Sequence, residues 1–272
     1  MRRLAGTRKV GHLGTLDPMA TGVLPLVLGR ATRLAQFFSS REKTYDASVQ
    51  FGWSTDTYDR EGTPTSEPVT PGFTREQLDV ALNSFRGNFM QKPPAFSAKK
   101  IAGTPAYRFA RKNIAVELEP VEVRVLALEV LEFTGVSARL CVRCSAGTYL
   151  RAIAHDAGRT LGCGAFLTAL RRTASGEFGD NQSRTLAVLE ELASHGALAD
   201  ALIPAAEVLP EIPNAVVDSL TAGQIRHGKD FRLSPFVARA DSKYVKAVSP
   251  EGDLIAIAEV RLPNLYHPVL VL

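Results

Sequence analysis

Alternation of apolar and polar residues predicts three long strands in the middle of the chain. Between residues 43 and 52 the apolar positions recur every second residue, at Tyr45, Ala47, Val49 and Phe51. This period of two is typical of a strand with one buried face. Residues 119–133 and 137–145 have the character of two paired strands. We therefore expect a mixed, mostly antiparallel sheet.

A helical period of apolar residues predicts helices at 30–38, 74–85, 105–112, 149–161 and 187–194. Thr74 precedes Glu76 and Gln77, which is close to an N-cap pattern. Strands and helices of this kind indicate an α+β fold in which helices cover the faces of the sheet.

Two segments lack the long periodic patterns of these strands and helices. Residues 11–18 are punctuated by glycine and proline, which predicts a loop, and the apolar residues 20–28 are expected to be buried. The tail from about residue 211 has short strand patterns at 244–248, 254–259 and 269–272, with a turn at 250–253. This tail is expected to form a small, separate β domain.

Composition limits the function classes only loosely. The chain has 272 residues, 32 Lys and Arg against 28 Asp and Glu, and a pI near 9.0, which permits a nucleic-acid partner without requiring one. Three cysteines are too few for a disulfide framework. Cys141 and Cys144 lie three apart on a predicted strand, so they face opposite sides and no zinc site is expected.

Targeting and membrane segments are not expected. The basic N-terminus lacks the apolar stretch of a signal peptide. The longest apolar run, residues 23–28, contains Pro25 and is too short to span a bilayer. We expect a soluble, cytoplasmic protein.

Asp17 is the first candidate for chemistry. It precedes Pro18 in a glycine-containing loop, and basic residues lie nearby in sequence. A carboxylate in a basic environment stays ionised and can act as a nucleophile or a base. The alternative from this segment alone is an aspartate that only forms a turn.

Several motifs in order carry a family resemblance. Residues 9–25, KVGHLGTLDPMATGVLP, and then residues 29–33, GRATR, closely resemble the signature of TruB-type tRNA pseudouridine synthases. Further blocks match at KTY (43–45), FG with TDT and Asp59 (51–62), FRG to AR (85–111), SAGTYLR (145–151), and LGCGA with LRRT (161–173). The resemblance covers residues 9–175 strongly and the tail loosely.

The resemblance implies a reaction and its residues. Asp17 would attack a uridine in the T loop of tRNA, at position 55, whose N1–C1′ bond is replaced by a C5–C1′ bond. Tyr45 would stack on the flipped base, Arg151 would pair with Asp17, Leu170 would line the uracil pocket, and His12 would support the RNA loop. Without the resemblance, Tyr45 is more simply a core residue, Arg151 a solvated one and His12 a structural one.

The resemblance also implies an RNA surface. Flipping a base costs a few kcal/mol, which contacts to the RNA backbone and stacking on aromatic side chains must offset. An insertion at about 88–113 would grip the T-arm of tRNA. The RNA-binding candidates are Lys99, Lys100, Arg108, Arg111, Arg171 and Arg172. No metal or other cofactor is expected, because the reaction is redox neutral, and a monomer is expected.

The domain prediction follows from the same comparison. Residues 1–205 would form the catalytic domain, and residues 211–272 would form an RNA-binding domain similar to PUA domains. Family members usually begin with an apolar strand and a Lys-Pro turn that do not precede Met1 here. The resemblance thus implies either a start assigned too late or a missing first strand, which would expose a sheet edge.

Two other functions remain as alternatives. One is a catalytically impaired tRNA-binding protein or tRNA folding chaperone of the same family. The other is an aspartate-dependent glycoside hydrolase, which normally needs two carboxylates flanking the bond. No second acid lies near Asp17 in the matched motif, which counts against the hydrolase.

Overall fold

The computed structural model describes residues 1–112, 114–234 and 242–272. Residue 113, the last of the predicted insertion, lies outside the described residues. Contacts between Cα atoms divide the chain into two compact units. Gly14–Leu24 and Ser39–Asn181 form one, and Met1–Leu13, Pro25–Phe38 and Gln182–Leu272 form the other.

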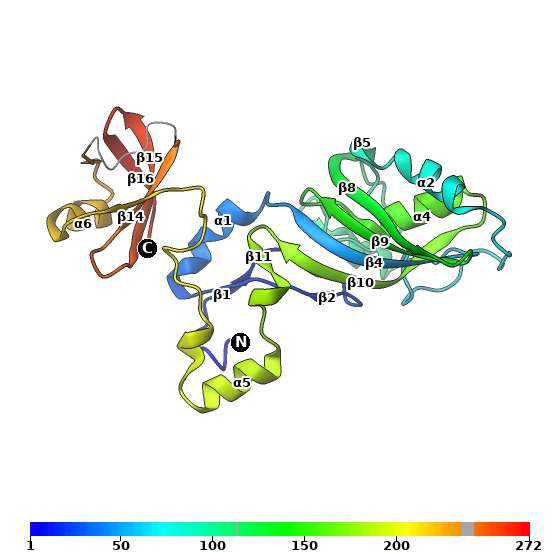
Figure 1. Cartoon of the computed structure of the whole chain (residues 1–272), viewed down its shortest axis with the longest axis horizontal. Helices are drawn as coiled ribbons and strands as arrows, with labels where there is room; N and C mark the ends of the chain where they lie inside the picture. The colour runs from blue at the N-terminus through cyan, green and yellow to red at the C-terminus, as the bar shows by residue number, and fades with distance from the viewer. Residues whose placement is uncertain (113, 235–241) are drawn as a thin grey trace. The chain divides into compact units, whose positions relative to one another are not determined.

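A seven-stranded sheet dominates the first unit. Its strands follow the order β11-β10-β4-β9-β8-β5, and β2 pairs with β10 at the side (Figure 1). Among the strand pairs of this sheet in the described residues, β2–β10 alone is parallel, so the predicted α+β fold with a mixed, mostly antiparallel sheet is confirmed. The strands are β2 (Thr21–Gly22), β4 (Lys43–Phe51), β5 (Gly87–Gln91), β8 (Val121–Phe133), β9 (Ser137–Cys144), β10 (Ala165–Ser175) and β11 (Phe178–Gly179).

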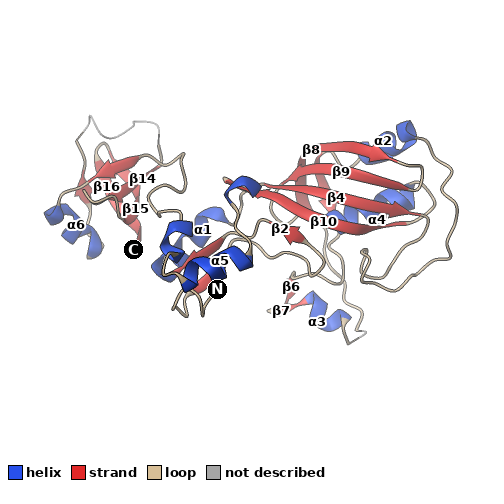
Figure 2. Cartoon of the chain, turned by 60° about the horizontal axis from the view of Figure 1, so that its bottom comes forward, coloured by secondary structure: helices blue, strands red, loops and turns tan. Residues whose placement is uncertain are grey.

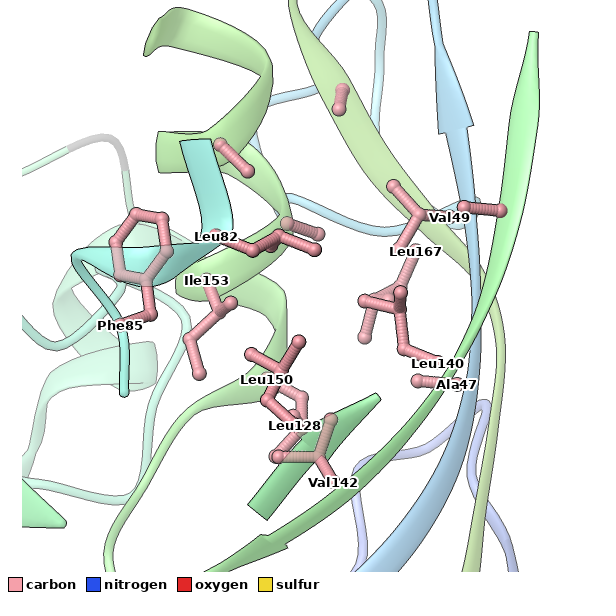
Figure 3. Close-up of a cluster of buried hydrophobic side chains, with 14 of the residues drawn as sticks. Ala47, Val49, Leu82, Phe85, Leu128, Leu140, Val142, Leu150, Ile153 and Leu167 are labelled. Atoms are coloured by element: carbon pink, nitrogen blue, oxygen red, sulfur yellow. The ribbon is translucent and has the colours of Figure 1, made fainter. Parts of the chain in front are cut away.

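Helices α2 (Arg75–Asn83) and α4 (Leu150–Thr160) contribute apolar side chains to the core of this sheet. Figure 3 shows Leu82 and Ile153 from the helices on one side and Val49 from the sheet on the other. The side chains on this face of β4 are buried: Ala47, Val49 and Phe51 are at most 2% exposed. The predicted alternation therefore gives the correct buried face.

The N-terminus of α2 follows its sequence pattern. The Thr74 hydroxyl accepts from the Gln77 amide, and the Gln77 side chain accepts from the Thr74 amide, which together make a capping box. This reciprocal pairing satisfies two backbone donors that a helix start leaves without intrahelical partners. It places the start of α2 at the residue that the sequence indicates.

Two expectations for individual segments were wrong or incomplete. Residues 20–28 are not uniformly buried, because Leu24 is 41% exposed and Leu26 is 37% exposed. Residues 165–175 were not predicted as a strand, yet β10 pairs with β4 along nearly its whole length. Residues 29–38 form a 3-10 helix, Gly29–Leu34, that continues as α1 (Ala35–Phe38).

The predicted insertion contains a short antiparallel pair and a short helix. Strands β6 (Lys100–Ile101) and β7 (Thr104–Pro105) pair with each other, and α3 (Ala106–Ala110) follows directly. The insertion belongs to the same unit as the seven-stranded sheet.

The second unit contains a five-stranded sheet in the order β12-β14-β15-β16-β13. Its strands are β12 (Asn214–Val216), β13 (Phe231–Arg232), β14 (Tyr244–Val248), β15 (Leu254–Leu262) and β16 (Leu265–Val271), and α6 (Ser219–Arg226) packs on it. The unit also holds the pair β1 (Val10–His12) and β3 (Leu26–Leu28), and helix α5 (Leu186–Ser194). Among the described residues, none of the helices has the length and apolar character needed to cross a membrane.

Candidate active site

The loop of Asp17 lies beside the seven-stranded sheet. Gly14 has a φ of +115°, which favours glycine, and the Asp17 carbonyl accepts from the Ala20 amide at 2.9 Å. Pro18 follows Asp17, which restricts the backbone of the aspartate to extended geometry. The Asp17 side chain stays 30% exposed, so a substrate atom can approach it.

Arg151 holds the Asp17 carboxylate with two donors. Its Nε donates to Oδ2 at 2.8 Å and its Nη2 donates to Oδ1 at 2.9 Å. This is the bidentate geometry that a guanidinium makes with a carboxylate. The structure therefore brings together the two residues that the sequence pairs.

Three further contacts fix Arg151, whose side chain is 4% exposed. Its Nη1 donates to the Thr57 carbonyl and its Nη2 to the Phe96 carbonyl, each at 2.9 Å. Its Nη1 also lies 3.4 Å from Oδ2 of Asp59. A buried guanidinium with its donors occupied has little freedom to turn, so it orients Asp17 firmly.

Asp59 is a further functional candidate. The sequence analysis named it only as part of a matched motif and gave it no role. Its side chain is 4% exposed, and its Oδ1 accepts from the Thr57 hydroxyl at 2.6 Å and from the Glu61 amide at 3.0 Å. A second acid does therefore share Arg151 with Asp17. Because the Asp59 carboxylate is buried, hydrogen-bonded at Oδ1 and ion-paired at Oδ2, it is suited to hold Arg151 rather than to protonate a leaving group.

Gln91, at the end of β5, fixes the start of α4. Its Nε2 donates to the Tyr149 carbonyl at 3.0 Å, and its Oε1 accepts from the Tyr149 amide at 2.8 Å. Gln91 is 2% exposed. Tyr149 is the N-cap of α4 and has no side-chain cap bond of its own, so Gln91 helps to place Arg151 in the first turn.

Tyr45 lies on β4, in register with Val142 of β9 and Arg172 of β10. Burial raises the pKa of Tyr45, whereas Arg172 lowers it and the Asp17 charge raises it. The phenol is therefore close enough to both Arg172 and Asp17 to be affected by their charges, and it is kept protonated at neutral pH.

The remaining substrate candidates differ in their surroundings. Leu170 lies on β10 opposite Ala47, is 6% exposed and belongs to the sheet core. His12 is exposed on β1, in the other unit.

Most of the predicted RNA-binding side chains are solvent-exposed. The exposed set is Lys99, Lys100, Arg108, Arg111 and Arg171. Arg171 also makes a forked ion pair with Asp180, at 2.9 Å for the shortest contact. The guanidinium of Arg111 lies 5.2 Å from the centre of the Tyr107 ring.

Arg172 lacks the exposure expected of an RNA-binding residue. Arg172 is 1% exposed and is one of the largest fully buried side chains. Neighbouring residues of a strand point to opposite faces, so β10 exposes Arg171 and buries Arg172. The unpredicted strand explains this burial.

Other polar groups near the site have structural contacts. Lys43 is 7% exposed and its Nζ donates to the Arg41 carbonyl at 2.6 Å. Burial, with a further contribution from Arg172, lowers the pKa of Lys43. Burial raises the pKa of Cys144 to about 11, and Cys141 and Cys144 are both free thiols. Within the described residues, no group of His, Cys, Asp or Glu side chains could hold a metal ion.

This arrangement suits a reaction that begins with an ionised carboxylate. Arg151 keeps the Asp17 oxygens in one orientation, and the exposed part of the carboxylate is open to an electrophilic carbon. A phenol lies nearby that can donate or accept a proton.

Comparisons with known proteins identify the family of the chain. Residues 2–150 match the model of the TruB family pseudouridylate synthase N-terminal domain, and residues 151–209 match that of the tRNA pseudouridylate synthase B C-terminal domain. The tRNA pseudouridine synthase B of Solibacter usitatus (strain Ellin6076) is 60% identical over the whole chain and 93% of its own length. That of Azoarcus sp. (strain BH72) is 44% identical over 85% of this chain and 76% of its own.

Solved structures give a consistent fold. A chain of a Cbf5-Nop10-Gar1 complex has a TM-score of 0.70 and 25% identity, over 97% of this chain and 73% of that one. A chain of an H/ACA RNP bound to a substrate RNA containing 2′-deoxyuridine also has a TM-score of 0.70. At 22% identity it supports the fold alone.

Proposed function

The chain belongs to the TruB family of pseudouridylate synthases and is an enzyme that isomerises uridine in tRNA, and we propose that its target is the uridine at position 55 of the T loop. The observation that carries the catalytic role of Asp17 in this proposal is its bidentate contact with Arg151, and the target position rests on the resemblance of the sequence motifs. No finding favours the catalytically impaired alternative, because the relatives are named as synthases. The hydrolase alternative is excluded by the family.

The proposed reaction begins at Asp17. Its carboxylate attacks the flipped nucleotide, at either the base or the ribose carbon, and the N1–C1′ bond breaks. The uracil turns within the site and C5 bonds to C1′. The bond between the Asp17 oxygen and the nucleotide breaks, which regenerates the free carboxylate. The proton of C5 leaves and N1 gains one, so that the product is an isomer of the substrate and no redox partner is consumed.

Two side chains assist this sequence in the proposal. Arg151 keeps Asp17 aimed at the nucleotide, because the fork of a guanidinium matches the two oxygens of a carboxylate. Tyr45 stacks on the base and takes part in removing the C5 proton. Its proximity to the Asp17 charge supports this role. Leu170 and His12 are proposed to contact the uracil and the RNA loop.

The RNA surface is proposed from exposure and charge. The insertion at about 88–113 grips the T-arm through Lys99, Lys100, Arg108 and Arg111, and Arg171 adds a contact beside the site. These side chains are exposed, and phosphate contacts are what position a protein on RNA. In this proposal residues 1–205 are the catalytic domain, and residues 211–272 are a PUA-like domain that adds RNA contacts.

The setting of the enzyme completes the proposal. We expect a monomer that acts in the cytoplasm, where its tRNA substrate is made. Sedimentation of the purified chain with and without tRNA would give the masses of the free protein and of the complex.

Mapping of pseudouridine in a tRNA transcript tests the function. The purified chain is incubated with an unmodified transcript, and products are labelled with carbodiimide and read by primer extension. A single stop at the T-loop uridine is expected, with no stop in a matched transcript that carries cytidine there. Tight binding without any stop would support the tRNA-binding alternative, and a stop elsewhere would overturn the position.

A further inference from the structure

The buried guanidinium of Arg172 is bonded to the backbone of the Asp17 loop. Its Nε donates to the Val23 carbonyl at 2.8 Å, its Nη2 to the Gly14 carbonyl at 3.1 Å and its Nη1 to the Thr15 carbonyl at 3.4 Å. The three carbonyls lie on both sides of Asp17 in the sequence. One rigid group therefore ties the two ends of the loop together.

The backbone of Arg172 holds the same loop. Residues 171 and 172 pair in parallel with Thr21 and Gly22 of β2, which runs beside β10 in Figure 2. The Val23 amide donates to the Arg172 carbonyl at 2.8 Å. Gly22 has a φ of +95°, and a Cβ there would lie 2.2 Å from the Arg172 carbonyl oxygen. Only glycine allows the loop to approach β10 this closely.

Arg172 and Arg151 differ in the charge of the groups that they contact. Arg151 faces two carboxylates, whereas no Asp or Glu in the described part of the chain lies within ion-pair distance of Arg172. A buried charge is tolerated when its donors are satisfied. Here the acceptors are carbonyls of the Asp17 loop. Arg172 also lies opposite Tyr45 in the β4–β10 register and lowers the pKa of its phenol.

We propose that Arg172 is a positioning residue that fixes the Asp17 loop relative to Tyr45, and that it does not bind RNA. The inference deepens the proposed function and rests on it, because the loop matters only if Asp17 is the catalytic carboxylate. Lysine cannot replace arginine in this role, because one ammonium cannot present a planar fork to three separate carbonyls.

Arg172→Lys tests the role through two readouts, catalysis and local exchange. The expected result is a fall in kcat of about 100-fold, since a displacement near 1 Å has an effect of that order, with KM and Kd for tRNA changed less than about 2-fold. Backbone hydrogen exchange is expected to rise in residues 14–24 and to stay unchanged in β4. Arg159→Lys, an exposed arginine on α4, is the control and should match the parent in both readouts.

The exchange measurement needs no turnover, so it keeps this inference distinct from the proposed function. Failure of the parent enzyme to make pseudouridine would reject the proposed function. The exchange result would then still decide whether Arg172 holds residues 14–24 in place. A raised Kd with unchanged exchange in residues 14–24 would make Arg172 an RNA ligand and overturn the inference. If Arg172→Lys does not fold, Arg172→Gln is measured in the same way. Failure of both to fold would show a role in the whole unit and also overturn it.

Discussion

Arg151 contacts two carboxylates that differ in exposure. Asp17 is 30% exposed at its side chain and Asp59 is 4% exposed. The exposed partner can meet a substrate, whereas the buried one can only compensate the charge of the guanidinium. Removing one member of a buried charge pair is costly, because it leaves the other without compensation. The division of labour between the two acids is therefore set by burial.

Asp59→Asn tests this division. The amide keeps the shape of the side chain but removes its charge, so Arg151 retains only one of its two anionic partners. We expect kcat to fall by about 10- to 100-fold through misplacement of Asp17, with little change in tRNA affinity. Asp56→Asn, in the same turn but exposed, is the control. Equal effects in both variants would mean that the turn, and not the charge near Arg151, is what matters.

His155 lies one turn beyond Arg151 on α4 and stacks on Tyr58 at 3.8 Å between ring centres. Burial lowers the pKa of His155 below the ordinary 6.5. Asp156 opposes this by raising the pKa, and Arg159 adds to it by lowering the pKa, both with smaller effects. The folded state therefore binds fewer protons than the unfolded chain as pH falls below 6.5. The contribution of His155 to stability is complete above that pH and is lost toward the folded-state pKa.

His155→Phe keeps a ring against Tyr58 but cannot take up a proton. As the pH is lowered from 7.5 to 5, we expect the free energy of unfolding to fall less for the variant than for the parent, as measured by urea denaturation. His195→Gln, at an exposed histidine, should show no such gain. A constant difference between parent and His155→Phe over this range would contradict the burial argument.

At the scale of elements, local patterns were sufficient where one face of a strand or helix is buried. The alternation in β4 and the Thr74 cap of α2 could be predicted because each depends on neighbouring residues alone. Strand β10 could not, since its segment is poor in β-branched residues and contains two adjacent arginines. Its pairing with β4 is a tertiary contact.

In the site, too, local sequence patterns were sufficient for individual residues but not for tertiary contacts. Asp17, Tyr45 and Arg151 were named from motifs, and the pairing of Asp17 with Arg151 was predicted as a consequence of the resemblance. The burial of Arg172 depends on the face of an unpredicted strand, so its lack of exposure could not be predicted from the sequence. The contact of Asp59 with Arg151 joins residues far apart in sequence, and no local signal reveals which acid would share that guanidinium.

The close approach of β2 to β10 makes Gly22 a sensitive position. Gly22→Ala would place a Cβ against the Arg172 carbonyl and also strain a positive φ. Gly135→Ala has the matched strain at a φ of +88°, but nothing lies within 4 Å of its Cβ. We expect kcat to fall at least about 10-fold for Gly22→Ala alone. Similar kcat values for both variants would contradict a special role for the approach.

At the scale of the whole molecule, the two units have separate apolar cores, one for each large sheet. The net charge is only +4, so affinity for tRNA must come from local clusters of cations rather than from a strong overall field. The exposed lysines and arginines of the insertion form the cluster that the sequence indicates most directly.

Salt dependence measures how many of these charges meet phosphate. Neutralising Lys99 and Arg111 together should weaken tRNA binding. It should also reduce the slope of log K against log salt by about 0.7 for each phosphate that the protein no longer neutralises. Glu117→Gln, an exposed acid beyond the insertion, serves as a charge-changing control. An unchanged slope in the double variant would place the T-arm binding surface elsewhere.

The most direct test of the central claim is the single-turnover rate of pseudouridine formation by Asp17→Asn at saturating tRNA, with the Kd measured in parallel. Asparagine keeps the size of the side chain but removes the nucleophilic carboxylate. We expect a rate below about one thousandth of that of the parent, with Kd within about 3-fold. A rate close to that of the parent, at normal affinity, would show that Asp17 is not the catalytic carboxylate.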